Sequence, residues 1–476
     1  MKIVIIGAAP TGLGAAYRLN ELQQSNDVAK NVELIVLEQE SYPGGLSCTV
    51  TDEKGFLWDM GGHITFNHNF PYYEHAVKEV VDEWNSLNRN CQVDVNYMFE
   101  EQGIHLVPYP AQYAIPLFPN DIKMNCLKDL KERYENKCTD FMPENFDEWI
   151  THHFGPTLRN CFFRIYSRKV WTVEPEKMNP IWVGTRVAKL PQAKLEQLCS
   201  MNANELVKAD FGWGPNATFT FPKYGGTGAV WKAMANKLPQ KWFRFNCKVT
   251  KVNAKEKRLT YVKKENGEER PIEIDYDVLI NSSPIDLLIK NSNLCSPLSI
   301  EHSKVYIIGI GLEKPMTEFV KQFTWLYFPD PTIPFYRVTI LSRYGEVTPD
   351  SSKYWSVMCE CARNIDDKTS EEEMCKMAIG GLVKKSIIKR EQIVSVYSTV
   401  LHYGYPIPTV KRDSELTRAH KVLEENGIYS RGRFGGWKYE YSNQDHCFIQ
   451  GKEVIDRILL NEPEHLYKTG LPIKQG

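Results

Sequence analysis

Glycine-rich segments near the start of the chain carry the clearest chemical signal. The first spans residues 7–14, follows a short apolar run at 3–6, and opens into helix-like apolar spacing over 13–22. This order places the free N–H groups and positive dipole of a helix N-terminus where the pyrophosphate of a dinucleotide binds. A second apolar run ends in Glu38, the acidic residue that such a unit needs for a ribose hydroxyl. Ala9 stands where a second glycine is usual, and its methyl group narrows the approach of the backbone to the phosphates.

Two further glycine segments indicate which dinucleotide is bound. Gly44 and Gly45 follow the acidic residue closely, and Gly61-Gly62-His63 comes soon afterwards. A lone glycine fingerprint is a weak signal, but here strand, loop, helix, strand and acid follow in the expected order. The chain then runs beside the cofactor twice more, which a nicotinamide enzyme does not need and a tightly held FAD does. The sequence therefore predicts an FAD site.

The composition is that of a large protein with ordinary surface chemistry. With 476 residues the chain exceeds one compact core, so two or three domains are expected. The formal net charge of −1 gives no electrostatic basis for binding nucleic acid or an anionic membrane surface. No apolar stretch reaches the length of a membrane span, and the chain enters a strand at once, without room for a signal peptide.

Cysteine and histidine spacing points to the cytoplasm and away from metal. The 12 cysteines contain no C-x-x-C pair, so reduced thiols of a cytoplasmic protein are expected rather than disulfides. His63 and His68, and the doublet His152-His153, lack neighbouring cysteines or helical His-x-x-x-His spacing. Metal binding is therefore not expected.

The order of patterns along the chain predicts three regions of an α/β protein. Residues 120–204 lack strand-like runs and contain amphipathic stretches, which predicts a helical insertion. Residues 305–405 change to β-rich, aromatic and proline-containing segments typical of an antiparallel sheet. We expect a discontinuous, Rossmann-like FAD-binding domain (1–85, 222–300 and 428–476), a helical substrate or insertion domain (120–204), and an antiparallel β-sheet substrate-binding domain (86–119, 205–221 and 301–427).

Arginine and aromatic residues gather in turn-rich segments beyond the glycine loops. They are Trp171, Arg186, Trp213, Trp325, Tyr327, Arg337, Tyr405, Arg433 and Tyr439, with Asn216 beside Trp213. Singly, each has an ordinary explanation as a surface arginine or a core aromatic residue. Together, the planar fork of arginine suits phosphate, and tyrosine hydroxyls add neutral donors. No serine-histidine-acid triad or paired-carboxylate signature stands out, so the site is expected to bind a nucleotide diphosphate and leave the chemistry to the flavin.

Longer motifs follow one another along nearly the whole chain. They are residues 7–16, 43–46 (Pro-Gly-Gly-Leu), 61–63 (Gly-Gly-His), 107–110 (Val-Pro-Tyr-Pro), 169–171 (Lys-Val-Trp), 213–218, 325–329, 334–337, 404–406, 430–435 and 443–446 (Asn-Gln-Asp-His). Each is ordinary alone, but in this order they closely resemble the UDP-galactopyranose mutases of the eukaryotic type.

The resemblance implies a role for each matching residue. Arg186 and Arg337 would grip the substrate diphosphate, and His63 would sit against the flavin ring; these are the expected catalytic residues. Expected substrate contacts are Tyr109, Gln112, Ser167, Trp171, Arg186, Asn216, Trp325, Tyr327, Arg337, Tyr405 and Tyr439. Expected cofactor contacts are Gly7, Ala9, Pro10, Thr11, Gly12, Glu38, Gly44, Gly45, Leu46, Gly61, Gly62, His63, Val249, Arg433, Asn443 and Gln444.

Three positions depart from the family pattern. Ala111 replaces a phenylalanine, Ser167 replaces an asparagine, and an arginine expected near 97–101 is absent. The first two changes weaken the expected nucleotide contacts, and the third weakens one cofactor contact.

The resemblance implies an FAD-dependent isomerase that interconverts UDP-galactopyranose and UDP-galactofuranose. N5 of reduced FAD would attack the anomeric carbon in a reaction without net redox change, with NADPH or NADH as the expected reductant. An oligomer formed through the helical domain would be compatible with this. Three alternatives stay open: a mutase for a related NDP-sugar, an amine-oxidase-like FAD oxidoreductase, and a sugar-nucleotide-binding protein without catalysis.

Overall fold

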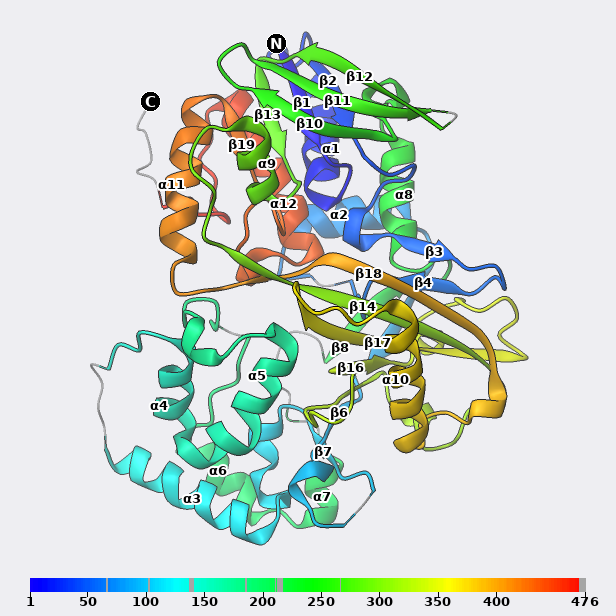
Figure 1. The fold of residues 1–476 in the computed structure, drawn as a ribbon, viewed down its shortest axis with the longest axis vertical. Helices are drawn as coiled ribbons and strands as arrows, with labels where there is room; N and C mark the ends of the chain where they lie inside the picture. The colour runs from blue at the N-terminus through cyan, green and yellow to red at the C-terminus, as the bar shows by residue number, and fades with distance from the viewer. Residues whose placement is uncertain are drawn as a thin grey trace.

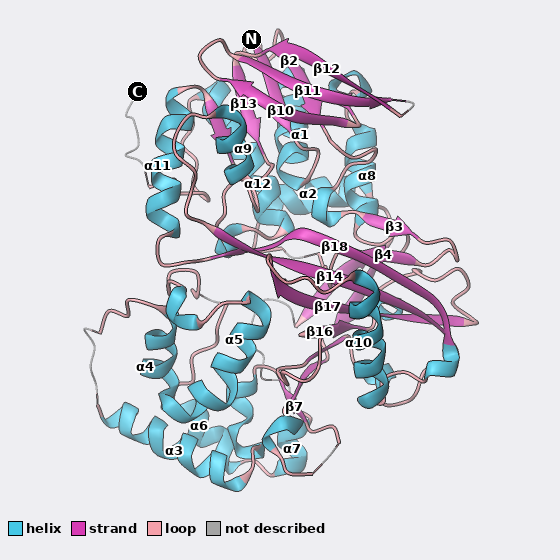
Figure 2. Ribbon diagram, in the orientation of Figure 1, coloured by secondary structure: helices cyan, strands magenta, loops and turns pink. Residues whose placement is uncertain are grey.

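The computed structural model describes residues 1–65, 67–101, 103–136, 141–184, 186–209, 211, 217–265 and 267–470. Figure 1 shows a β/α region at the top with the first strand and last helix, a broad sheet across the middle, and a group of helices at the bottom. Figure 2 separates the strands of the middle region from the helices below them. The mixed α/β class predicted from the sequence is confirmed.

A five-stranded parallel sheet forms the centre of the β/α region. Its order is β19-β13-β1-β2-β9, with bounds Ile428–Ser430, Val278–Asn281, Lys2–Ile6, Glu33–Leu37 and Phe243–Arg244. Ile3 and Ile5 of β1 belong to the core beneath a helical layer, whereas Val4 and Ile6 belong to the core beneath a second sheet. Burial on both faces explains why β1 is an unbroken apolar run.

The helical layer brings the two ends of the chain together. It consists of α1 (Pro10–Ser25), α2 (Pro71–Val80), α8 (Gly228–Lys237) and α12 (Gln444–Leu460). A Cβ on Gly14 of α1 would collide with the Phe448 carbonyl oxygen, and one on Gly451 of α12 would collide with that of Thr11. The first and last helices therefore pack with their backbones in contact.

The opposite face of the parallel sheet is covered by a three-stranded antiparallel sheet and two helices. The strands are β10 (Cys247–Asn253), β11 (Arg258–Glu265) and β12 (Glu268–Asp275), and the helices are α9 (Ile285–Ser292) and α11 (Arg412–Glu425). Their apolar side chains complete the core around Val4 and Ile6.

A seven-stranded sheet crosses the middle of the molecule. Its order is β18-β14-β17-β16-β15-β6-β7, with bounds Ile393–Ile407, Glu301–Glu313, Tyr354–Asn364, Arg337–Thr339, Trp325–Tyr327, Cys91–Asp94 and Leu106–Pro108. Its pairs are antiparallel, as expected, except β6 with β15, which run parallel. Helix α10 (Glu371–Lys384) packs on the sheet within a segment predicted to be strand-rich, and it begins with a capping box between Ser370 and Glu373.

One hairpin and one two-stranded ribbon pack against this sheet. The hairpin β3 (Thr49–Thr51) and β4 (Leu57–Asp59) lays its Phe56 and Trp58 rings over Gly311 and Gly309 of β14, where side chains would leave no room. The other pair is β5 (Trp84–Asn88) with β8 (Thr218–Pro222). Because the β3–β4 hairpin packs on β14, it fixes the path of the chain that leads into Gly61-Gly62-His63.

The lower region is helical, with its own aromatic core. It contains α3 (Asn120–Glu135), α4 (Phe146–Leu158), α5 (Arg164–Trp171), α6 (Gln192–Ser200) and α7 (Ala203–Val207). Helix α4 is kinked at Gly155-Pro156 and continues through a π-helical turn, Arg159–Phe163, into α5. Lys169 of α5 donates from Nζ to the Phe328 and Asp330 carbonyl oxygens, at 2.5 and 2.6 Å, which joins this region to the sheet.

Among the described residues, no helix is both long and apolar enough to cross a bilayer. No disulfide joins the cysteines that the structure describes, and their reduced state stays a prediction.

Candidate cofactor and substrate cavity

One cavity of about 1370 Å³ connects the β/α region with the seven-stranded sheet. It begins at the carboxyl ends of β1 and β2, runs along β18, and reaches the N-terminus of α12 and the short strands β15 and β16. Its walls contain residues predicted for the cofactor and residues predicted for the substrate. The two predicted sites therefore share one space.

The glycine loop forms one end of the cavity. Gly7 has a φ of +98° and faces Ser282, whose hydroxyl a Cβ would strike, and a Cβ on Gly12 would strike the Gly7 carbonyl oxygen. Helix α1 starts directly after this turn, with Pro10 at its first position. Its N-terminal N–H groups thus lie at the cavity wall, as an anion-binding helix terminus requires.

Ala9, which stands where a second glycine is usual, packs against a glycine of the second glycine loop. Gly45, with a φ of +54°, approaches Ala9 so closely that a Cβ on Gly45 would lie 2.9 Å from the Ala9 Cβ. Ala9 and Gly45 both line the cavity. The methyl group of Ala9 is therefore accommodated by the absence of a side chain on the second glycine loop.

Glu38 lies at the carboxyl end of β2, where the sequence predicted the acidic residue. Its Oε2 accepts from the Ala8 N–H at 2.8 Å, and its Oε1 accepts from the Glu40 N–H at 2.9 Å. The side chain is buried, and this burial raises its pKa. Two backbone donors orient the carboxylate at the cavity wall, where it can receive a further hydroxyl donor.

A buried ion pair organises the far end of the cavity. The Arg337 guanidinium binds Glu360 of β17 through Nε and through Nη2, the latter at 2.7 Å from Oε1. Burial would raise the pKa of Glu360, but the charge and hydrogen bonds of Arg337 hold that pKa below its usual range. Both residues line the cavity, and the Arg337 side chain is the more exposed of the two, at 20% against 4% for Glu360.

His63 lies beside this pair. Gly62 passes over Arg337 so closely that a Cβ there would lie 3.1 Å from the Arg337 Cζ. Burial lowers the pKa of His63 to about 4; Glu360 opposes this shift, whereas Arg337 and Arg433 add to it. The imidazole is therefore neutral near pH 7, and its buried Nδ1 has no hydrogen-bond partner among the described residues.

Tyrosine hydroxyls and a second arginine surround the same space. The Tyr336 hydroxyl donates to Glu360 Oε1 at 3.0 Å and lies 3.3 Å from the Tyr405 hydroxyl. Burial raises the pKa of both phenols, which keeps them neutral. Arg433 lies over the Tyr405 ring at 4.9 Å and donates to the Gly404 carbonyl oxygen at 3.2 Å. Further cavity residues of this kind are Tyr109, Trp325, Tyr327 and Tyr439.

Arg186 reaches the cavity from the helical region. Its Nη2 donates to the Glu440 carbonyl oxygen at 3.0 Å and to Asn443 Oδ1 at 3.3 Å, with its guanidinium 4.4 Å from the centre of the Tyr439 ring. Gln444, the next residue, accepts at Oε1 from the Trp231 indole at 2.7 Å. The N-terminus of α12 is thereby tied to the helical layer and to Arg186.

The cavity gathers most of the predicted residues but not all of them. Gln112, Ser167 and Trp171 are buried in the helical region and do not line this cavity. Gln112 donates to the Ala188 carbonyl oxygen at 2.8 Å, and Trp171 packs edge-on against Tyr439 at 4.8 Å. Gly12, Gly44 and Gly61 stand behind the wall rather than in it. Asn216 and Trp213 lie outside the described residues.

Sequence reasoning missed two residues of the site, Glu360 and Tyr336. Glu360 lies between Cys359 and Cys361 in the apolar middle of a strand, and an acid in such a run signals a buried partner. Nothing in the sequence identified that partner as Arg337.

Similarity to known proteins agrees with this arrangement. Residues 10–302 match the family of flavin containing amine oxidoreductases. A crystal structure of reduced UDP-galactopyranose mutase matches with a TM-score of 0.86 and 35% identity, covering 97% of this chain and 94% of that one. A protein from Exiguobacterium sp. provisionally named protoporphyrinogen oxidase gives 0.69 and 15%, covering 97% and 99%. A CLA-producing fatty acid isomerase from P. acnes gives 0.58 and 15%, covering 96% and 98%; these last two likenesses concern the fold alone.

Proposed function

This chain belongs to the UDP-galactopyranose mutases, within the flavin containing amine oxidoreductase fold, and we propose that it interconverts UDP-galactopyranose and UDP-galactofuranose with a bound FAD. The observation that carries the proposal is one cavity that joins the glycine loop and N-terminus of α1 to an arginine-and-tyrosine cluster. A substrate held at the cluster shares that space with a cofactor held at the glycine loop.

We propose that the cofactor is held by the loops and helix termini that line the cavity. These residues are Gly7, Ala9, Pro10, Thr11, Glu38, Gly45, Leu46, Gly62, His63, Val249, Arg433, Asn443 and Gln444. When bound and reduced, FAD supplies a nucleophilic ring nitrogen, with NADPH or NADH as the proposed reductant. The buried, unused Nδ1 of neutral His63 supports this assignment, because it can accept or donate one hydrogen bond to a group in the cavity.

The substrate diphosphate is proposed to bind between the two arginines. Arg337 is held in place by Glu360 and keeps an exposed face toward the cavity. Arg186 must exchange the Glu440 carbonyl and the Asn443 side chain for phosphate oxygens, which makes it the adjustable member of the pair. Neutral tyrosines add donors without adding charge, and they exclude water from the anomeric carbon.

The charge states of the residues around Arg337 support the proposed class of substrate, a sugar nucleotide. Near the Arg337 cluster, Glu360 stays ionised and His63 stays neutral, so neither is suited to donate a proton near pH 7. The chain's own residues therefore bind, orient and desolvate the substrate. The match to the amine oxidoreductase family favours a second candidate, an FAD oxidoreductase acting on an amine.

One experiment separates these functions. Purified protein, reduced anaerobically, is incubated with UDP-galactofuranose, and formation of UDP-galactopyranose is followed by chromatography. We expect conversion with reduced flavin only, and without one NADPH lost per product. The matched control is the double variant Arg337→Gln/Glu360→Gln, which should keep FAD and lose conversion. Equal activity with oxidised flavin would contradict the proposal. So would hydrogen peroxide formation with an amine in place of conversion.

A further inference from the structure

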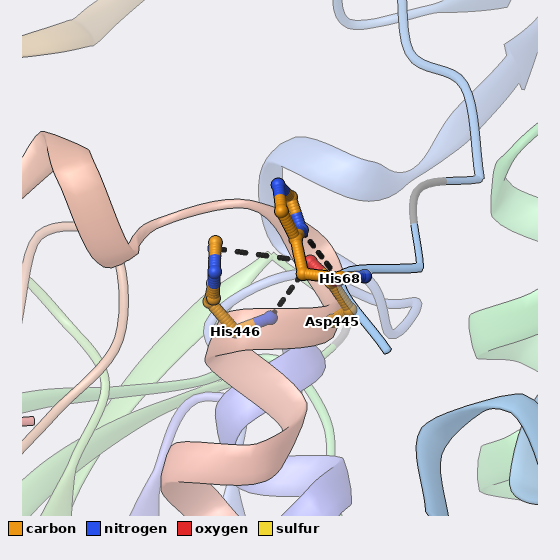
Figure 3. A group of neighbouring side chains, drawn as sticks. All are labelled: His68, Asp445 and His446. Carbon is orange, nitrogen blue, oxygen red and sulfur yellow. Dashed lines mark hydrogen bonds and ion pairs between the residues drawn. The ribbon is translucent and has the colours of Figure 1, made fainter. Parts of the chain in front are cut away.

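A second side-chain group lies in the cavity wall outside the Arg337 cluster: His68, Asp445 and His446 (Figure 3). His68 lies five residues beyond His63 on the same segment, whereas Asp445 and His446 form the first turn of α12. His68 and His446 line the cavity, and Asp445 lies between their backbones. None of the roles proposed above uses these three side chains.

The three side chains are held close by the carboxylate. Asp445 Oδ2 lies 2.8 Å from His68 Nδ1 and accepts from the His68 backbone N–H at 2.9 Å. Oδ1 accepts from the His446 backbone N–H at 2.8 Å and lies 3.8 Å from His446 Nδ1. The two imidazoles are stacked, with ring centroids 4.3 Å apart. One ligand atom from each residue lies within 4.8 Å of the others.

Among the described residues, the Asp445 carboxylate has no lysine or arginine partner and the His446 ring has a nitrogen without a hydrogen bond. Asp445 is fully buried, and in the described part of the chain its recorded ion-pair partners are histidines, not lysine or arginine. A buried carboxylate without a fixed cation is unfavourable. The His446 side chain is 8% exposed, and its Nδ1 has no hydrogen-bond partner among the described residues. A buried negative charge and an unused ring nitrogen therefore face one another.

We propose that His68, Asp445 and His446 bind a divalent cation of the zinc class. Two imidazoles and one carboxylate are donors that zinc favours, whereas magnesium and calcium prefer oxygen alone. Ligand atoms at 2.0–2.2 Å around a tetrahedral zinc are about 3.3 Å from one another, so the ligand atoms here, all within 4.8 Å, must close by at most about 1.5 Å. His68 is 27% exposed on the cavity side, which gives the ion an entry path and an open fourth position.

Binding there has a consequence for the flavin end of the cavity. The ion would link the segment that carries His63 to the helix turn that carries Asn443 and Gln444. His63, Asn443 and Gln444 are all proposed cofactor contacts, so bound zinc should also alter the flavin absorbance spectrum.

The test measures metal on the untagged, FAD-loaded protein. After chelator treatment, the protein is dialysed against micromolar zinc chloride and then against buffer, and bound zinc is counted by elemental analysis. The wild type should retain one equivalent. His446→Ala and the partly exposed His68→Gln should each weaken binding more than tenfold. His152→Gln, taken from the other neighbouring histidine pair, should not.

Bound flavin in each variant reports that the fold is kept. The proposal fails if the wild type retains no zinc, or if both His446→Ala and His68→Gln retain it as the wild type does. The count does not depend on turnover, so it stands or falls separately from the mutase activity.

Discussion

Replacing one or both members of the Arg337–Glu360 ion pair should separate the stability of the protein from its affinity for substrate. Arg337→Gln leaves the Glu360 carboxylate buried, with the Tyr336 hydroxyl at 3.0 Å as its remaining side-chain donor. Removing one partner of a buried pair costs about 3–5 kcal/mol, and we expect that loss in the free energy of unfolding. In Arg337→Gln/Glu360→Gln no charge remains, so at least about half of the loss should be recovered.

Substrate affinity should behave differently. A charge-assisted hydrogen bond to phosphate contributes about 1.5–3 kcal/mol, so both variants should bind UDP about 10- to 100-fold more weakly. Stability should also change its dependence on pH. In the wild type the lowered pKa of Glu360 contributes stability above about pH 4.5 that is lost as pH falls. In Arg337→Gln the unpaired carboxyl should titrate higher, so acidification should relieve part of the defect.

Denaturant unfolding of the FAD-loaded protein and calorimetry with UDP measure the two effects. Arg363→Gln is the matched control, because Arg363 of β17 forms a looser, partly exposed pair, at 3.8 Å, with Asp367 just beyond the strand. That variant should cost less than about 1 kcal/mol. If the double variant bound UDP like the wild type, Arg337 would not be a diphosphate ligand. If Arg337→Gln were no less stable than Arg363→Gln, the energetics assigned to the buried pair would be wrong.

Three further predictions concern the cofactor end, a departure from the family pattern, and pH. Gly45→Ala should abolish FAD binding, because the new Cβ would lie 2.9 Å from the Ala9 Cβ at a φ of +54°. Adding Ala9→Gly should restore part of the visible flavin absorbance, whereas normal FAD content in the single variant would contradict the prediction. Ala111→Phe should destabilise the fold by about 1–3 kcal/mol without tightening the binding of UDP, because Ala111 is 1% exposed in the core of the helical region. Tighter UDP binding in calorimetry at unchanged stability would show instead that the ring reaches the nucleotide. Burial lowers the pKa of His63 from 6.5 to about 4, so the neutral form contributes stability above pH 6.5 that is lost as pH falls toward 4; His63→Gln should flatten this part of the stability profile, and identical profiles would refute it.

Local spacing was enough to predict the start of the fold. The strand, glycine turn and helix around residues 3–22 follow a short-range pattern, and α1 extends it to Pro10–Ser25. Helix α10 was missed because long strands flank it, although Ser370 followed by Glu373 is a recognisable capping signature. The parallel pairing of β6 with β15 depends on segments far apart in the chain, and no spacing rule fixes such a pairing.

The same distinction between local and long-range features decides which site residues could be predicted. Residues within the glycine loops could be placed because their roles depend on backbone geometry over a few positions. The partner of Arg337 could not, because Glu360 is one of many acids in the sequence and only the sheet brings the two together. The same holds for His68 and Asp445, which are 377 residues apart. Roles for Gln112 and Ser167 came from the family resemblance alone and stay predictions.

The backbone contact between α1 and α12 also affects how the protein is made. The glycine loop is synthesised before the rest of the cavity, but the helix that packs against Gly14 and completes the cavity is synthesised only after β13, β18 and β19. A nascent chain can build the parallel strands around β1 only after β13 and β19 have emerged, and α12 follows β19 in the chain. The cavity is therefore incomplete until α12 has been made, and a stop codon that removes α12 would leave the glycine loop without this part of its wall.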